Sequence, residues 1–181
     1  MKWMIASDLH GSAYWTEKLL AAFEREGCGR LILLGDVLYH GPRNDLPEGY
    51  APKQVIALLS AVKEKILCVR GNCEAEVDQM VLPFPVMADY AVLPVGERLV
   101  YITHGHTHNM KTCPPLQRGD ILLHGHTHVP ACEAFGDGNM YLNPGSASLP
   151  KEESHHGYMT LEEGLFLWKD MDGEIKKEYK A

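Results

Sequence analysis

The feature that most constrains this sequence is the heptapeptide at residues 122–128, Leu-Leu-His-Gly-His-Thr-His. An apolar run that starts at Ile121 is typical of a buried strand, and it leads directly into a glycine-containing loop with three histidines at alternate positions. Side chains alternate with a period of two in an extended segment, so His126 and His128 can point the same way. This pattern predicts a metal site at the end of a strand, with oxygen ligands supplied from elsewhere in the chain.

The remaining periodicity predicts an α/β domain with helices in the first half and mostly strands in the second. Amphipathic helices are expected at residues 14–25 and 54–65, a helical turn at 78–82, and a turn or helix start at 114–118. Strands are expected at residues 2–7, 31–34, 66–69, 90–93, 99–103, 121–123, 131–135, 140–142, 158–161, 165–169 and 175–179. The pair at 131–135 and 140–142 flanks a Gly-Asp-Gly-Asn turn and predicts a β-hairpin.

Polar side chains follow the apolar strands at the points where these end. They are Asp8, His10, Asp36, Asn72, His104, His126 and His128. Ligands bind at the carboxyl ends of strands in open α/β sheets, so these seven residues converge on one edge if their strands are neighbours.

The chemistry of this set favours transition metals. Two carboxylates, one amide and four imidazoles without a thiolate suit manganese, iron, zinc, cobalt or nickel better than calcium or magnesium, which prefer oxygen alone. Seven ligands exceed one tetrahedral site, but they suffice for two metals if one carboxylate bridges. A bridged pair about 3.5–4 Å apart activates water and clamps a phosphoryl group.

The order of these motifs resembles the calcineurin-like metallophosphoesterases. The motifs are D-x-H at 8–10, G-D at 35–36, G-N at 71–72, H-G-H at 104–106 and G-H-T-H at 125–128. The small size, the Gly-Pro at 41–42, the Gly-Asn-Cys-Glu at 71–74 and the Asn-Pro-Gly-Ser at 143–146 are most similar to the compact bacterial YfcE-type phosphodiesterases. The resemblance spans residues 4 to about 148.

This resemblance implies a fold and a set of ligands. The fold would be a four-layer α/β/β/α sandwich with two facing mixed β-sheets. One metal would be held by Asp8, His10, Asp36 and His128, and the second by Asp36, Asn72, His104 and His126. Asp36 would bridge the two ions, and a hydroxide between them would attack phosphorus. We expect manganese first, with zinc, iron, nickel or cobalt as alternatives. The 143–146 segment would support the metal loop.

The sequence His-Gly-His-Thr-His occurs twice, at 104–108 and at 124–128. We assign the paired ligands to the second copy, because Val-Pro follows it as in the family motif and a strand precedes it directly. His106, His108 and His124 are then predicted non-ligands, with His106 close to the substrate. Arg43, in the proline-rich loop at 41–52, is a candidate phosphate contact.

Asp36, Asn72 and Cys73 are the catalytic candidates, and Cys73 is where the chain departs from the family pattern. Many members have a histidine after the Gly-Asn pair, where it can act as a general acid toward the leaving group. A neutral thiol is a weaker donor, so we expect phosphodiesters with good leaving groups to be preferred over alkyl monoesters. The alternative for Cys73 is a buried small apolar side chain.

Charge and cysteine content narrow the choice of partners. The formal net charge of −7 repels polyanions, so a small phosphodiester is expected as substrate rather than a long nucleic acid. Five cysteines without a CxxC pair and without a signal peptide favour a cytoplasmic protein, and no apolar run predicts a membrane span. We expect one domain over residues 1–181, with the proline-rich loop available for a homo-oligomer interface.

The competing function is a non-catalytic protein-interaction scaffold with the same fold, as in the metallophosphoesterase-like retromer subunit. Loss of catalysis should appear as replaced metal ligands, and His10 is the position to inspect. All seven positions carry ligand-type residues here.

Overall fold

The computed structural model describes residues 1–181, and its first sheet has β1 at the centre. The six strands have the order β11-β10-β9-β1-β2-β3. β1 and β2 pair in parallel, as do β2 and β3, whereas β9, β10 and β11 continue the sheet in antiparallel pairs on the other side of β1. The strands are β1 (Trp3–Ala6), β2 (Arg30–Leu33), β3 (Ile66–Cys68), β9 (Gly157–Glu162), β10 (Leu165–Asp170) and β11 (Ile175–Lys180).

The second sheet has five strands in the order β4-β5-β6-β8-β7. Its three central strands β5, β6 and β8 are parallel, and the antiparallel strands β4 and β7 form its edges. β7 and β8 form the predicted hairpin. The strands are β4 (Ala91–Val95), β5 (Arg98–Ile102), β6 (Ile121–Leu123), β7 (Pro130–Phe135) and β8 (Asn139–Pro144).

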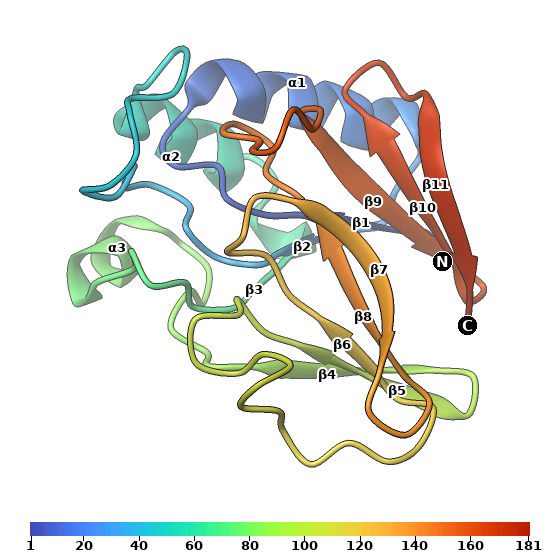
Figure 1. Cartoon of the computed structure of the whole chain (residues 1–181). Coiled ribbons are helices and arrows are strands. Elements are labelled where there is room, and N and C mark those ends of the chain that lie inside the picture. The colour runs from blue at the N-terminus through green and yellow to red at the C-terminus, as the bar shows by residue number, and fades with distance from the viewer.

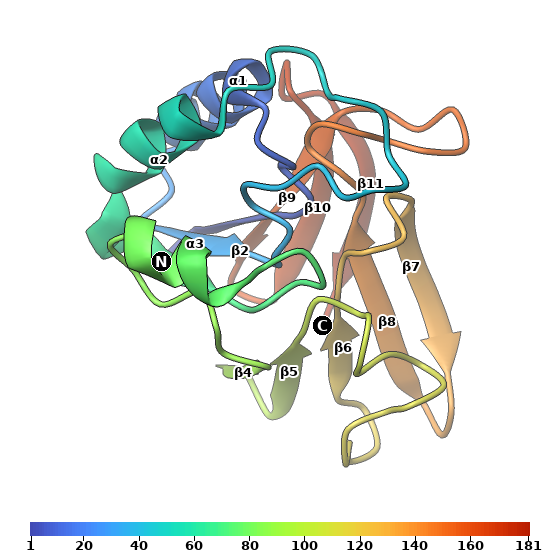
Figure 2. The same ribbon diagram turned by 90° about the vertical axis from the view of Figure 1, so that its left-hand side faces the viewer.

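Helices α1 and α2 cover one face of the first sheet, and the second sheet lies against the other face (Figures 1 and 2). The Ser12 hydroxyl caps α1 by accepting a hydrogen bond from the Trp15 amide, and α2 starts with a proline, whose fixed φ suits the first helical turn. The helices are α1 (Ala13–Arg25), α2 (Pro52–Ser60) and α3 (Glu76–Val81), with a 3₁₀ turn at Lys63–Lys65. None of the three α-helices combines the length and apolar character that crossing a bilayer would require.

β1 and most of β2 are apolar because both faces of the sheet are buried there, whereas the edge strand β11 is polar and exposed. Met4 and Ala6 pack toward the helices, whereas Ile5 between them packs in the cluster that lies between the two sheets. That cluster also contains Val100 and Ile121 from the second sheet, so the sheets share one core. This shared core supports the prediction of one domain, which stays a prediction.

The predicted pair of facing mixed sheets with flanking helices is confirmed. Two details differ from the expectation. The second helix ends at Ser60 rather than Lys65, and residues 114–118 contain no helix. The long connection from β5 to β6, residues 103–120, consists of turns, so the outer face of the second sheet lacks a long helix of its own.

Candidate metal centre

Five of the predicted ligands adopt a backbone conformation that is rare for non-glycine residues. The φ angles are 57° at Asp8, 47° at His10, 54° at Asp36, 68° at His126 and 63° at His128. Left-handed non-glycine residues carry conformational strain that surrounding structure must offset, and they cluster at functional sites. The conformational strain therefore lies in the loops that follow the strands and carry the predicted ligands.

These φ angles correct one step of the sequence argument. The segment that carries His126 and His128 is not extended, so the two rings do not point the same way by strand alternation. His126 turns toward His104, with 3.1 Å between His126 Nδ1 and His104 Nε2, whereas His128 turns toward His10. Because His126 and His128 are both left-handed, their side chains point in different directions, one toward His104 and the other toward His10.

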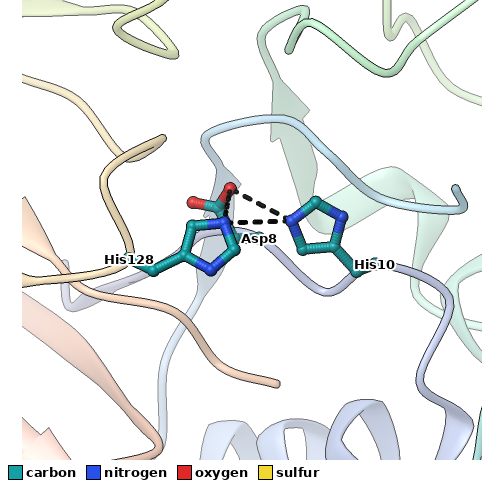
Figure 3. Close-up of side chains that lie close together, drawn as sticks. All are labelled: Asp8, His10 and His128. Carbon is teal, nitrogen blue, oxygen red and sulfur yellow. Dashed lines mark hydrogen bonds and ion pairs between the residues drawn. The ribbon is translucent and has the colours of Figure 1, made fainter. Parts of the chain in front are cut away.

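Asp8, His10 and His128 form the first half of the site, and their polar atoms converge although β1 and β6 belong to different sheets (Figure 3). His128 Nε2 lies 3.2 Å from Asp8 Oδ1, and His10 Nε2 lies 3.5 Å from the same oxygen. The three side chains are buried.

The hydrogen bonds of these two histidines determine which ring nitrogen carries the proton. His10 Nδ1 lies 2.8 Å from the Tyr39 carbonyl oxygen, and His128 Nδ1 lies 2.6 Å from the Leu149 carbonyl oxygen. A carbonyl only accepts, so both Nδ1 atoms are donors and the Nε2 atoms of the neutral rings are bare. Two bare nitrogens only 3.1 Å apart repel each other, and a cation between them removes that repulsion.

The second half contains His104, Asn72 and His126. His104 Nδ1 donates to the Leu34 carbonyl oxygen at 2.7 Å, which leaves the neutral ring's Nε2 as an acceptor that faces Asn72 Oδ1 at 3.1 Å. The Asn72 amide nitrogen donates to Cys73 Sγ, which holds its oxygen toward the site. His104 Nε2 and Asn72 Oδ1 are therefore two acceptors that face each other without a proton between them, as the Nε2 atoms of His10 and His128 are.

Asp36 connects the two halves. Its Oδ2 lies 3.7 Å from His10 Nε2 in one half and 3.5 Å from His104 Nε2 in the other. Its Oδ1 accepts a hydrogen bond from the Cys73 amide at 2.9 Å, which orients the carboxylate. This is the position that a bridging carboxylate needs.

The donor set fits divalent cations. Asp8 Oδ1 is fully buried and has no hydrogen-bond partner, which is costly for a charged oxygen unless a cation binds it. Burial by itself raises the pKa of Asp8, but positive charge on the imidazoles of His10, His128 and His104, when these rings are protonated, holds that pKa well below the usual range. The carboxylate is therefore charged and available as a ligand.

Glu74 is a buried residue of the site that the sequence argument missed. It accepts hydrogen bonds from three backbone amides, those of Asp36 at 2.9 Å, Val37 at 2.7 Å and Gly71 at 2.5 Å. Burial and the neighbouring Asp36 raise the pKa of Glu74, and the three amide donors act against this rise. The side chain thus ties the loop after β2 to the loop after β3. Its place in the Gly-Asn-Cys-Glu motif was the only signal in the sequence.

Residues 143–146, at the end of β8 and directly after it, support the metal loop, as the family resemblance implied. The Asn143 amide donates to the Gly125 carbonyl and to the Thr127 hydroxyl, both at 3.0 Å. Ser146 and Ser148 donate to the carbonyl oxygen of Asp8. Gly125 itself leaves no space for a Cβ atom, which would overlap Ser7 and crowd the Asp8 carboxylate.

The ligand cluster opens into a cavity of about 350 Å³. Arg43 and Cys73 line this cavity, and so does Lys151, which the sequence argument did not select. Burial, followed by the nearby Asp36 carboxylate, raises the pKa of the Cys73 thiol, so the thiol is neutral. Only one of the eleven lining residues is hydrophobic.

The other histidines of the two repeats lie in different surroundings. His106 is exposed, with its ring centroid 5.4 Å from that of His104 and 6.3 Å from that of His126, and it does not line the cavity. His124 is buried and stacks on Tyr141, and burial lowers its pKa to about 4. His108 packs against Tyr90, next to β4. That these three bind no metal stays a prediction.

Comparison with known sequences identifies relatives of this chain. The model of the calcineurin-like phosphoesterase superfamily domain matches residues 1–164. Phosphodiesterase YfcE of Escherichia coli K12 is 46% identical over 162 residues, which cover 90% of this chain and 88% of that protein. The probable metallophosphoesterase YsnB of Bacillus subtilis is 30% identical over 105 residues, 54% of this chain and 57% of YsnB.

Solved structures give the same result for the fold. The structure of the phosphoesterase YfcE from E. coli superposes with a TM-score of 0.95 at 42% identity and covers 99% of both chains. Vacuolar protein sorting 29 from Cryptosporidium parvum has a TM-score of 0.62 at 17% identity, covering 99% of this chain and 98% of that one. At that identity the second match bears on the fold alone.

Proposed function

Because the chain belongs to the calcineurin-like phosphoesterase superfamily, we propose that it hydrolyses small phosphodiesters with the help of two divalent metal ions. The observation that carries this proposal is the place of Asp36 Oδ2, within 3.7 Å of His10 Nε2 in one half of the site and 3.5 Å of His104 Nε2 in the other. A carboxylate in that position can be shared by two cations.

Asp8, His10, Asp36 and His128 would hold one ion, and Asp36, Asn72, His104 and His126 would hold the second. When bound, such a pair supplies an activated water molecule and neutralises charge on the phosphoryl oxygens. Manganese is our first choice for both sites, with zinc, iron, nickel or cobalt as alternatives, since nitrogen and oxygen ligands of this kind accept them all.

The protein's own part in the reaction is to hold these groups rigidly. Backbone carbonyls fix the rings of His10, His104 and His128 through their Nδ1 atoms, so every Nε2 points into the site. The Cys73 amide fixes the Asp36 carboxylate, and Glu74 fixes the Asp36 backbone by accepting from the amides of Asp36 and Val37. Asp36 and Asn72 would act through the ions, and Arg43, which lines the cavity, would contact a phosphate group of the substrate.

The environment of Cys73 supports diesters with good leaving groups as the preferred substrates. Its thiol is half-buried beside Asp36, where it stays neutral and donates a hydrogen bond only weakly. A leaving group that needs a proton during bond cleavage therefore gains little from this residue. Alkyl monoesters are expected to react slowly.

The scaffold alternative receives no support from the site. A scaffold does not need five left-handed non-glycine residues, nor two unprotonated imidazole nitrogens that face each other. Both features destabilise the fold, so a scaffold would gain stability by replacing these residues. All seven ligand positions are kept here, and the E. coli relative at 46% identity is named a phosphodiesterase.

A chromogenic aryl phosphodiester tests the proposal. Purified protein is assayed with added Mn²⁺ and after chelation, together with Asp36→Asn and, as a matched control, Asp45→Asn in an exposed part of the 41–52 loop outside the cavity. We expect metal-dependent turnover that Asp36→Asn lowers by at least about 100-fold and Asp45→Asn leaves unchanged. An absence of turnover with manganese, zinc, iron, nickel and cobalt would favour the scaffold.

We also infer a cytoplasmic location, for which the five unpaired cysteines are the supporting observation. A homo-oligomer through the 41–52 loop stays a prediction, and the mass in solution tests it.

A further inference from the structure

Two cationic side chains line the cavity without a carboxylate partner. No carboxylate oxygen lies within 4.0 Å of the Arg43 guanidinium or the Lys151 ammonium, so neither charge is neutralised by an ion pair. Most of the 17 basic residues lack such a pair, and what distinguishes these two is that both line the cavity beside the predicted metal ligands.

The loop that carries Lys151 is attached to the metal centre. The Lys151 amide donates to the carbonyl oxygen of His128 at 3.1 Å, and the Lys151 carbonyl accepts hydrogen bonds from the amide and the hydroxyl of Ser154. This turn fixes the backbone of Lys151 against that of a proposed ligand. The lysine is therefore held at the cavity wall rather than on a free loop.

The lining of the cavity limits what an ester arm of the substrate can be. One hydrophobic residue among eleven offers little contact to an acyl chain or an aromatic ring, whereas Asn44, Thr127 and the two cations offer hydrogen bonds. A volume of about 350 Å³ is more than a phosphoryl group fills. The room beyond the metals is therefore polar and positively charged.

We propose that Lys151 and Arg43 bind a second phosphate group on one ester arm of the substrate, so that the enzyme selects phosphodiesters that carry a further phosphate. This inference rests on the proposed function and extends it to substrate class. A diester phosphate has a single negative charge, which two divalent cations would already compensate. Arg43 can contact a second phosphate through two parallel hydrogen bonds, and Lys151 adds a compact point charge.

Two nucleoside probes that differ only in the second phosphate test this proposal. One is the p-nitrophenyl ester of thymidine 5′-phosphate, and the other is the same compound with an added 3′-phosphate. The leaving group and the sugar are identical, so the ratio of their kcat/KM values measures recognition of the second phosphate. For the wild-type protein we expect the 3′-phosphorylated probe to be preferred by about 10-fold or more, the value of one charged hydrogen bond.

Variants then assign the preference to residues. Lys151→Gln and Arg43→Gln should each reduce the ratio toward one, mainly through KM, Lys151→Arg should retain it, and Lys151→Glu should reverse it. Lys63→Gln, an exposed lysine outside the cavity, is the matched control and should leave both rates unchanged. Calorimetric titration with thymidine 3′,5′-bisphosphate and thymidine 5′-phosphate should give the same order of affinities without turnover.

The outcomes separate the two proposals. Hydrolysis of neither probe with any of the metals overturns the proposed function. Hydrolysis of both at equal kcat/KM leaves that function standing and overturns the inference, as does a preference that survives in both Lys151→Gln and Arg43→Gln.

Discussion

His10 and His128 face each other through Nε2 atoms 3.1 Å apart, and in the neutral rings neither nitrogen carries a proton. Each ring has its proton on Nδ1, where a backbone carbonyl accepts it. The fold holds the two nitrogens together against their mutual repulsion, so any divalent cation that binds them contributes to the free energy of unfolding as well as to catalysis.

Metal binding is therefore expected to raise the melting temperature. At a free metal concentration of 100 Kd the gain is about 2.7 kcal/mol, which corresponds to roughly 5–10 °C for a chain of this size. His128→Gln should lose most of this rise, and His108→Gln, which lies outside the site, should keep it. Differential scanning fluorimetry of chelated and metal-loaded protein measures both. A full shift in His128→Gln would remove that residue from the ligand set.

Cys73→His is expected to change the choice of substrate. A histidine in this place can protonate a leaving oxygen, so hydrolysis of alkyl phosphomonoesters should rise by about 10-fold or more, in the range of general acid catalysis. An aryl diester with a good leaving group should gain much less.

Cys113→His is the matched control for that experiment, because Cys113 is exposed and lies outside the cavity. Steady-state kinetics on both substrate types give the comparison. Equal changes for good and poor leaving groups would show that position 73 does not protonate the leaving group.

The convergence of the site could be predicted from the sequence because it depends on a general property of sheets. Asp8, Asp36 and Asn72 follow three strands that turn out to be parallel neighbours, and His104 and His126 follow two parallel neighbours in the second sheet. The choice between the two His-Gly-His-Thr-His copies stays a prediction, and it is supported by the position of His126 and His128 among the other predicted ligands.

The orientations within the site could not be predicted, because they depend on contacts between segments far apart in sequence. Strand alternation suggested that His126 and His128 point the same way, but positive φ angles turn them apart. Glu74 accepts from amides 37 and 38 residues earlier in the chain, at Val37 and Asp36. Lys151 lines the cavity, and its amide donates to the carbonyl oxygen of His128. The spacing of residues within one segment does not predict contacts of this kind.

Glu74→Gln is expected to weaken the site without removing a ligand. An amide has one acceptor oxygen in place of two, so at least one of the three backbone donors loses its partner in a buried place. The cost should be about 1–3 kcal/mol, with a lower affinity for the metals because Asp36 is less well held. Glu76→Gln, two residues away and exposed on α3, is the control. Melting temperatures and metal titrations that match those of the wild type would contradict this role.

Glu26 predicts an acid-sensitive contribution to stability away from the metal centre. Its carboxylate accepts hydrogen bonds from the half-buried Lys2 and the nearly buried Lys169. Burial raises the pKa of Glu26, but the bonds from Lys169, Lys2 and Tyr158 lower it to about 2. The folded pKa thus lies below the ordinary value near 4.5, so the stabilisation is complete above pH 4.5 and is lost as the pH falls from there toward 2.

Glu26→Gln should accordingly be less stable than the wild type at neutral pH by on the order of 2 kcal/mol. That gap should stay constant above about pH 5.5 and narrow steadily below pH 4.5, because Glu26 of the unfolded wild-type chain is then protonated while the folded carboxylate stays ionised until the pH approaches 2. Glu24→Gln, at an exposed position in the last turn of α1 two residues before Glu26, should show no such gap. Urea unfolding of the three proteins across this pH range isolates the effect, since acid effects on the histidine site are common to all of them. A gap of constant size down to pH 2.5 would mean that Glu26 stabilises the fold through packing and not through its charge.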